Sequence, residues 1–291
     1  MSRVLVTGGS GFIGRQTLAP LRARGYEVHA PRSRDADLLA PGTAARLVRE
    51  LRPSHLLHLA WDARPGRFWT ATENLAWVEG SLRLLHAFAE AGGRRAVLAG
   101  TCAEYGWSDE VHCVEGETPL EPATLYGAAK HGLHVVARRY GEQAGVSLAW
   151  GRIFFVFGPH EDPARLAASV ALALVRGEPA ETGAGTAVRD FLFSEDLGDA
   201  FAALLDSSVE GAVNVASGEP RPIRDLVEAL GAAAGRPDLL RIGARPPNPS
   251  EPAAITAAVD RLRDEVGWRP RRTLEQRAAD TVTWWRQAER A

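Results

Sequence analysis

The sequence predicts an α/β protein with a doubly wound parallel sheet and a smaller, discontinuous C-terminal domain. Over the first 150 residues, short apolar runs alternate with helical patterns, and the first apolar run leads straight into closely spaced glycines. Strands that alternate with helices form parallel sheets covered on both faces. The chain has 291 residues, enough to bury a large core.

The first strand is expected at Val4–Thr7, before a glycine turn and a helix that runs to Ala23. Four more apolar runs predict strands at residues 27–30, 55–60, 96–100 and 147–153. Helical patterns separate them at residues 44–51, 73–91 and 125–144. Because few residues lie between Ala30 and Leu38, we expect the second and third strands to be joined by a plain loop.

The residue pattern changes after Phe157-Gly158-Pro159, where proline and glycine become more frequent and apolar runs alternate less regularly. Here the sequence predicts a helix at 164–176, a short strand and helix within 191–205, a strand at 212–216 and a last helix at 274–286. Prolines at 246, 247, 249 and 252 predict that residues 243–252 form an irregular loop.

Composition excludes several functional classes. The formal net charge is -2, and no apolar run approaches the ~20 residues of a membrane span, so we expect neither a nucleic-acid surface nor a membrane protein. We therefore expect a soluble, cytoplasmic chain. Its two cysteines, Cys102 and Cys113, are expected to stay reduced. Cysteines and histidines show no zinc-ligand spacing, so no metal is expected.

Glycines 8, 11 and 14 form G-x-x-G-x-x-G between a strand and a helix. This spacing lets the backbone approach a pyrophosphate at a helix N-terminus, and it predicts a dinucleotide site. A tight turn, a flavin site or a methyl-donor site are the alternatives. The residues expected to line the cofactor here are Gly8, Ser10, Gly11, Phe12, Ile13, Gly14, Leu59 and Ala60.

The second strand lacks the terminal carboxylate that takes a ribose 2′-hydroxyl, and Arg32 and Arg34 follow it. Guanidinium groups suit a 2′-phosphate, so NADP is favoured and NAD is the alternative. In an arginine-rich chain, both residues could also be ordinary surface arginines. Asp37 and Leu38 are expected to follow as a strand that lines the adenine.

Tyr126 and Lys130 are four residues apart on a predicted helix, and Lys130 is the only lysine in the chain. Residues at this spacing share a helix face, so the ammonium is expected near the phenol. A neighbouring cation favours the phenolate, which would lower the pKa of Tyr126 and suit it to proton transfer.

The run Thr7-Gly8-Gly9-Ser10-Gly11-Phe12-Ile13-Gly14, together with Tyr126 and Lys130, resembles the extended short-chain dehydrogenase/reductase family, in its epimerase/dehydratase branch. The resemblance covers nearly the whole chain, through Arg189-Asp190-Phe191, Asn214–Gly218 and Gly267–Pro270. It implies a Rossmann fold, with residues 1–152 as the dinucleotide-binding domain, to which 187–217 return. Residues 153–186 and 218–291 would form the substrate domain.

The resemblance also assigns catalytic roles to Tyr126, Lys130 and Thr101, the last because Thr101 lies five residues before the glycine of Tyr105-Gly106. Dehydratases of the branch carry an Asp-Glu pair after this threonine, whereas this chain has Cys102 and Ala103. Dehydration is therefore disfavoured, and hydride transfer to or from a ketone remains.

The resemblance therefore leads us to expect NADPH-dependent reduction of a nucleotide-activated 4-keto-6-deoxysugar. The alternatives are a nucleotide-sugar 4-epimerase with tightly bound NAD and a non-catalytic NADP-binding protein. Phe155 replaces an asparagine that helps the family hold the nucleotide diphosphate. The family also suggests a homodimer formed through helices 73–91 and 125–144. Residues expected to face the substrate are Trp61, Cys102, Ala103, Arg152, Phe155, Arg165 and Arg189.

Overall fold

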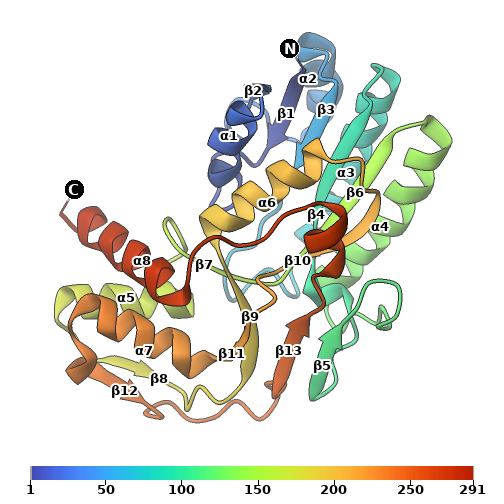
Figure 1. Cartoon of the computed structure of the whole chain (residues 1–291). Coiled ribbons are helices and arrows are strands. Elements are labelled where there is room, and N and C mark those ends of the chain that lie inside the picture. The colour runs from blue at the N-terminus through green and yellow to red at the C-terminus, as the bar shows by residue number, and fades with distance from the viewer. Residues whose placement is uncertain (1, 291) are drawn as a thin grey trace.

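A six-stranded parallel sheet forms the centre of the computed structural model, which describes residues 2–290 (Figure 1). Its strand order is β10-β6-β4-β3-β1-β2, and every neighbouring pair is parallel. This confirms the predicted fold class. The strands are β1 (Arg3–Thr7), β2 (Glu27–His29), β3 (His55–His58), β4 (Arg95–Thr101), β6 (Ser147–Ile153) and β10 (Gly211–Val215).

Helices cover both faces of this sheet (Figure 1). On one face lie α1 (Gly14–Ala23) and α6 (Ser194–Asp206), and on the other lie α2 (Thr43–Leu51), α3 (Glu73–Glu90) and α4 (Leu125–Ala144). Every residue of β4 is buried, as expected for a strand covered on both sides.

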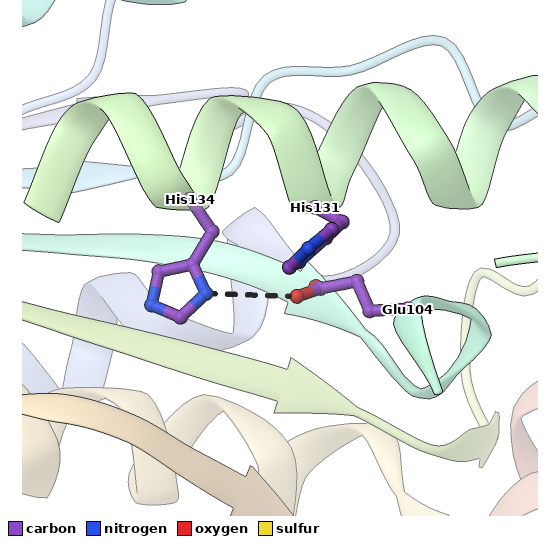
Figure 2. A group of neighbouring side chains, drawn as sticks. All are labelled: Glu104, His131 and His134. Carbon is purple, nitrogen blue, oxygen red and sulfur yellow. Dashed lines mark ion pairs between the residues drawn. The ribbon is translucent and has the colours of Figure 1, made fainter. Parts of the chain in front are cut away.

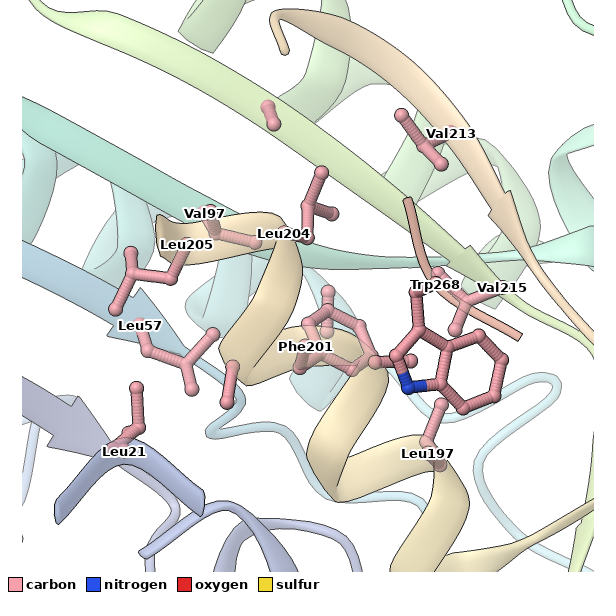
Figure 3. Packing of buried hydrophobic residues seen from close by; sticks show 14 of the residues in the cluster. Leu21, Leu57, Val97, Leu197, Phe201, Leu204, Leu205, Val213, Val215 and Trp268 are labelled. Atoms are coloured by element: carbon pink, nitrogen blue, oxygen red, sulfur yellow. The ribbon is translucent and has the colours of Figure 1, made fainter. Parts of the chain in front are cut away.

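Helix α6 packs closely on the central sheet, which limits the side chains that fit between them. Figure 3 shows Phe201 of α6 packed among aliphatic side chains of the sheet, with Trp268 nearby. A side chain at Gly151 of β6 would lie 2.7 Å from the Phe201 ring, so glycine is what lets the helix approach. Burying one such aromatic ring contributes about 1.5–3 kcal/mol.

The rest of the chain forms a second group of strands and helices. A five-stranded sheet has the order β11-β9-β13-β5 with β7 beside β9, and β12 pairs with β8. The strands are β5 (Glu110–Cys113), β7 (Phe155–Phe157), β8 (Ala180–Thr182), β9 (Val188–Phe193), β11 (Pro220–Pro222), β12 (Leu240–Ile242) and β13 (Ala254–Ala257). The helices α5 (Leu166–Arg176), α7 (Ile223–Ala234) and α8 (Leu274–Ala288) share one apolar cluster.

Two expectations about the chain need correction. The second and third strands are not joined by a plain loop, because α2 lies between them. Residues 37–38 form no strand and belong to the irregular segment before α2. Among residues 2–290, no helix combines the length and the apolar character needed to cross a bilayer.

Candidate active site

A cavity of about 540 Å³ opens where β1 and β3 end, at the point where the strand order reverses. Ligands of doubly wound sheets bind at this edge. Most of the residues predicted to bind the cofactor or the substrate line this cavity. They are Gly8, Ser10, Gly11, Phe12, Ile13, Gly14, Asp37, Leu38, Leu59, Ala60, Trp61, Tyr126, Lys130 and Arg165.

The glycine loop is shaped so that side chains would not fit in it. Gly8 has φ +73°, in the region that favours glycine, and its Cβ would lie 2.8 Å from the backbone nitrogen of Ala60. A Cβ on Gly14 would overlap the Gly8 carbonyl and lie 2.8 Å from Cα of Gly9. The loop therefore presents bare backbone at the start of α1, a cradle that fits a dinucleotide pyrophosphate.

Arg15 stabilises the glycine loop through hydrogen bonds to its backbone. Its guanidinium donates to the carbonyls of Ser10 (2.7 Å) and Gly11 (3.2 Å), and its Nη1 lies 2.7 Å from Nδ1 of His160. The His160 ring lies 4.5 Å from that of Trp284, on α8. The glycine loop is thus connected through two side chains to the last helix.

Asp37 and Leu38 also line the cavity, and their contact with an adenine stays a prediction. Arg32 and Arg34 are exposed and are not among the residues that line it, although Ser33 between them is. Arg34 instead lies 3.7 Å from the Asp35 carboxylate. The geometry therefore gives the arginines no contact with the cavity, and the choice of NADP stays a prediction.

Tyr126 lies in the first turn of α4, whose N-cap Thr124 accepts a hydrogen bond from the backbone of Gly127. Burial raises the pKa of Tyr126, and hydrogen bonding with Thr101 opposes that rise. The expectation that Lys130 brings the phenol toward the phenolate is therefore not met in this structure. Thr101 itself ends β4, is buried, and is not among the residues that line the cavity, so its contact with a substrate stays a prediction.

Lys130 is 5% exposed, and its ammonium has two anchors. Nζ donates to the carbonyl of Ala99 (3.0 Å) and lies 3.8 Å from the centroid of the Trp61 ring, a cation–π contact. Burial lowers the pKa of Lys130 to about 7, while the charge of Glu104 acts in the opposite direction.

Aromatic side chains that sequence reasoning missed surround the phenol. The rings of Phe68 and Trp69 meet Tyr126 edge to face at 4.9 and 5.8 Å, and the Trp69 carbonyl accepts the Tyr126 N–H. Trp61, which was expected near the substrate, meets the same ring at 6.3 Å, and its indole nitrogen donates to Asn74. The run Arg67-Phe68-Trp69, soon after a strand end, was the available signal.

Two segments that the sequence analysis largely passed over also line the cavity. Asp62, Ala63 and Arg64 belong to the first, Asp162 and Arg165 belong to the second, and Arg165 connects them by donating to the Ala63 carbonyl (3.3 Å). The anion-binding role expected for Arg165 remains a prediction.

Five residues expected to face the substrate are not among those that line the cavity: Cys102, Ala103, Arg152, Phe155 and Arg189. Cys102 and Ala103 are buried in the short helix η1 (Cys102–Glu104), and Phe155 packs beside Phe191 on β9. The two arginines are used internally, as described next, so these five are not carried into the proposed site.

Both arginines are paired with carboxylates. Nε of Arg152 lies 3.0 Å from Oε2 of Glu104, and both side chains are buried. Nη2 of Arg189 donates to Glu251 (3.1 Å) and to the carbonyl of Pro252 (2.9 Å), in the proline-rich loop. Each guanidinium already has partners within the chain, which explains why neither reaches the cavity.

Contrary to the sequence analysis, the structure does bring together a group of metal-ligand types. Figure 2 shows His131 and His134 of α4 beside the carboxylate of Glu104, and one ligand atom of each lies within 4.8 Å of the others. However, Glu104 already accepts hydrogen bonds from Thr101, Trp150 and Arg152. A second cation next to the buried guanidinium would be repelled, so this group does not fit a metal.

Glu161 precedes Asp162, which lines the cavity, and it makes the stability of the fold depend on pH. It is 5% exposed, its Oε2 has no hydrogen-bond partner among the described residues, and burial raises its pKa to about 8. A carboxyl whose folded-state pKa is raised favours folding when protonated, and this stability is lost as the pH rises toward the folded-state pKa.

Replacing Glu161 by glutamine should therefore increase stability at alkaline pH. We expect the Tm of Glu161→Gln to exceed that of the wild type at pH 8.5 and the difference to shrink at pH 5, with roughly 2–4 °C for each kcal/mol. Thermal denaturation at both pH values measures this. The exposed Glu117→Gln variant is the control, and an equal Tm for Glu161→Gln and wild type at pH 8.5 would contradict the argument.

A comparison with protein families finds one match. The model of the NAD dependent epimerase/dehydratase family matches residues 4–216. Among curated proteins, a UDP-glucose 4-epimerase of Rhizobium meliloti (strain 1021) is 28% identical over 326 aligned residues, covering 98% of this chain and 96% of the relative.

Solved structures also resemble this chain over nearly its whole length. The UDP-glucose 4-epimerase of Thermus thermophilus, in complex with NAD, superposes with a TM-score of 0.84 at 28% identity, covering 98% of this chain and 99% of that one. RMD from Pseudomonas aeruginosa, complexed with NADPH, has a TM-score of 0.86 at 26% identity, with 99% and 100% covered.

Proposed function

The chain belongs to the NAD dependent epimerase/dehydratase family, and from this premise we propose that it is a nucleotide-sugar 4-epimerase that works with bound NAD. The observation that carries the proposal is that Tyr126 and Lys130 line the same cavity as the glycine loop. A dinucleotide seated on that loop would therefore share one pocket with a proton donor and a buried ammonium.

The bare glycine backbone, the adenine-side Asp37 and the Lys130 ammonium fit such a dinucleotide. When bound, it supplies reversible hydride transfer. The Lys130 ammonium, together with the positive charge of a bound NAD, would favour the phenolate of Tyr126, which could then take the proton of the sugar 4-hydroxyl and return it to the 4-oxygen of the product. Thr101, through its hydrogen bond with the phenol, would hold Tyr126 in position. Lys130 would bind the ribose hydroxyls, and the aromatic rings around Tyr126 would exclude water.

Two observations favour an epimerase with NAD over the reductase that the sequence analysis put first. The relatives with the highest similarity reported above include UDP-glucose 4-epimerases that align with nearly the whole chain. In addition, Arg32 and Arg34, which carried the argument for NADP, are not among the cavity-lining residues.

The test uses purified protein with UDP-glucose or UDP-galactose and no added reductant. The expected result is that each sugar nucleotide is converted into a mixture of both, with cofactor retained by the protein. A protein that converts neither of them, and instead consumes NADPH stoichiometrically with a 4-keto sugar nucleotide, would overturn the epimerase proposal.

The second candidate is therefore NADPH-dependent reduction of a nucleotide-activated 4-keto-6-deoxysugar. Ser33, which lies between the two arginines in the sequence, lines the cavity, so the segment that carries them borders the proposed cofactor site. RMD from Pseudomonas aeruginosa, at 26% identity, was solved with NADPH. NADPH oxidation in the assay above separates the two candidates.

We also propose the division into a dinucleotide-binding domain (1–152 with 187–217) and a substrate domain (153–186 with 218–291). A homodimer through α3 and α4 is supported by exposed apolar side chains on both helices, namely Leu75, Val135 and Val136. Sedimentation of the wild type and of Val136→Glu tests the dimer.

A further inference from the structure

Glu104 is a carboxylate that the proposed chemistry does not use, although it lies directly behind the candidate catalytic groups. It is 0% exposed. Oε1 accepts hydrogen bonds from the Thr101 N–H and the Trp150 indole, both at 2.8 Å, and Oε2 accepts from Nε of Arg152 at 3.0 Å. A fully buried carboxylate with three donors, one of them a guanidinium, is held rigidly in one place.

The carboxylate lies against β4 at Gly100, between the two residues that connect it to the site. A Cβ on Gly100 would be only 2.6 Å from Oε1, so the absence of a side chain there is what admits Glu104. On one side, Thr101 is fixed by its N–H bond to Glu104. On the other, the Ala99 carbonyl accepts from Lys130.

We propose that Glu104 is a positioning residue for the active site: it fixes the backbone of Thr101 and supplies the buried negative charge that keeps Lys130 an ammonium. The part concerning Thr101 and turnover rests on the proposed function. The part concerning the charge of Lys130 does not, because it can be measured without any substrate.

Burial in the fold disfavours the charged form of Lys130. Burial of the ammonium lowers its pKa to about 7, so a further loss of stabilisation would leave much of it neutral at physiological pH. Glu104 opposes this effect. A neutral amine would bind ribose hydroxyls with fewer donors and would no longer favour negative charge developing on the nearby oxygens.

The other titratable groups nearby do not account for this charge. His58 and His134 are buried, and burial lowers the pKa of each to about 3, so both are neutral near pH 7. Burial raises the pKa values of Cys102 and Tyr126, which keeps them protonated. The remaining groups that face Glu104 are Arg152, its ion-pair partner, Tyr105, which bonds that guanidinium, and His131.

The single lysine makes the test direct. Protein grown with ¹³C-labelled lysine gives one lysine side-chain NMR signal, and its chemical shift against pH reports the midpoint of Lys130 alone. Glu104→Gln keeps an oxygen that can accept the Thr101 N–H but removes the charge. We expect its lysine midpoint to fall by about one pH unit or more relative to wild type, with the alkaline limb of the pH–activity profile moving in the same direction.

The matched control is Asp196→Asn. Asp196 lies 3.0 Å from Nε of Arg277 in another mostly buried ion pair, and neither residue is among those that line the cavity, so this variant reproduces the loss of such a pair. Its lysine midpoint should equal that of wild type. If Glu104→Gln does not fold, the double variant Glu104→Gln/Arg152→Gln takes its place, because it leaves no unpaired buried guanidinium. Adding His131→Asn to Glu104→Gln should leave the shift of the lysine midpoint unchanged.

The outcomes separate clearly. A lower midpoint in the Glu104 variants but not in Asp196→Asn supports the proposal. An unchanged midpoint in a folded Glu104 variant, or an equal shift in Asp196→Asn, overturns it. Stoichiometric Zn²⁺ retained by wild type and lost in His131→Asn would also overturn it, because Glu104 would then be a ligand. Failure of the epimerase assay leaves the lysine titration unaffected.

Discussion

Replacing Tyr126 by phenylalanine is expected to reduce kcat by about 10²- to 10⁴-fold, the usual contribution of a positioned general acid–base group. The phenylalanine ring keeps the edge contacts with Phe68 and Trp69, so the pocket keeps its shape. What is lost is the hydroxyl that exchanges a proton with the sugar oxygen. KM and cofactor retention should change little.

Steady-state kinetics with UDP-glucose and a thermal melt measure this prediction together. Tyr140→Phe is the control, because Tyr140 lies near the other end of α4, where its hydroxyl meets His86. We expect Tyr140→Phe to retain wild-type turnover. If Tyr126→Phe lost less than about tenfold in kcat, the phenol would not be the acid–base group and the proposed mechanism would fail.

Replacing Gly14 by alanine is expected to weaken cofactor binding by about 10- to 100-fold, corresponding to ~1–3 kcal/mol of overpacking. The new methyl group would overlap the Gly8 carbonyl and lie 2.7 Å from its carbon. Both are backbone atoms, so the loop must open rather than a side chain turn aside. The N–H groups that would face the pyrophosphate then move apart.

Cofactor content after purification and titration with NAD measure the loss. Gly132→Ala is the matched control, since a Cβ at this helical glycine of α4 would meet nothing within 4 Å. That variant should bind cofactor normally and melt slightly higher, because alanine favours a helix by about 1 kcal/mol over glycine. Normal affinity in Gly14→Ala would mean that the loop does not hold the pyrophosphate.

The central sheet was predictable because most of its strands, such as β3, β4 and β6, are largely buried and consist of short apolar runs. The second group of elements was less so. Strands such as β5, β11 and β13 are three or four residues long and partly exposed, and they pair with segments far away in the chain. Neither alternation nor length marks such strands in one sequence. Helix α7 was also missed, although its apolar side packs on α5 and α8.

In the candidate site, residues that lie close together in the sequence could be predicted, whereas ion pairs between distant residues could not. The glycines and the Tyr126–Lys130 pair were found because each motif lies within one turn or one helix. By contrast, Arg152 looks like any strand arginine until the fold brings it to Glu104. The same holds for Arg189 and Glu251, which are 62 residues apart in the chain.

The path from Arg15 through His160 to Trp284 means that the end of the chain helps to shape its beginning. A chain shortened to end before α8 would lose Trp284, which packs against the His160 ring. The first sign of such a truncation should be faster release of the bound nucleotide, before any general loss of secondary structure.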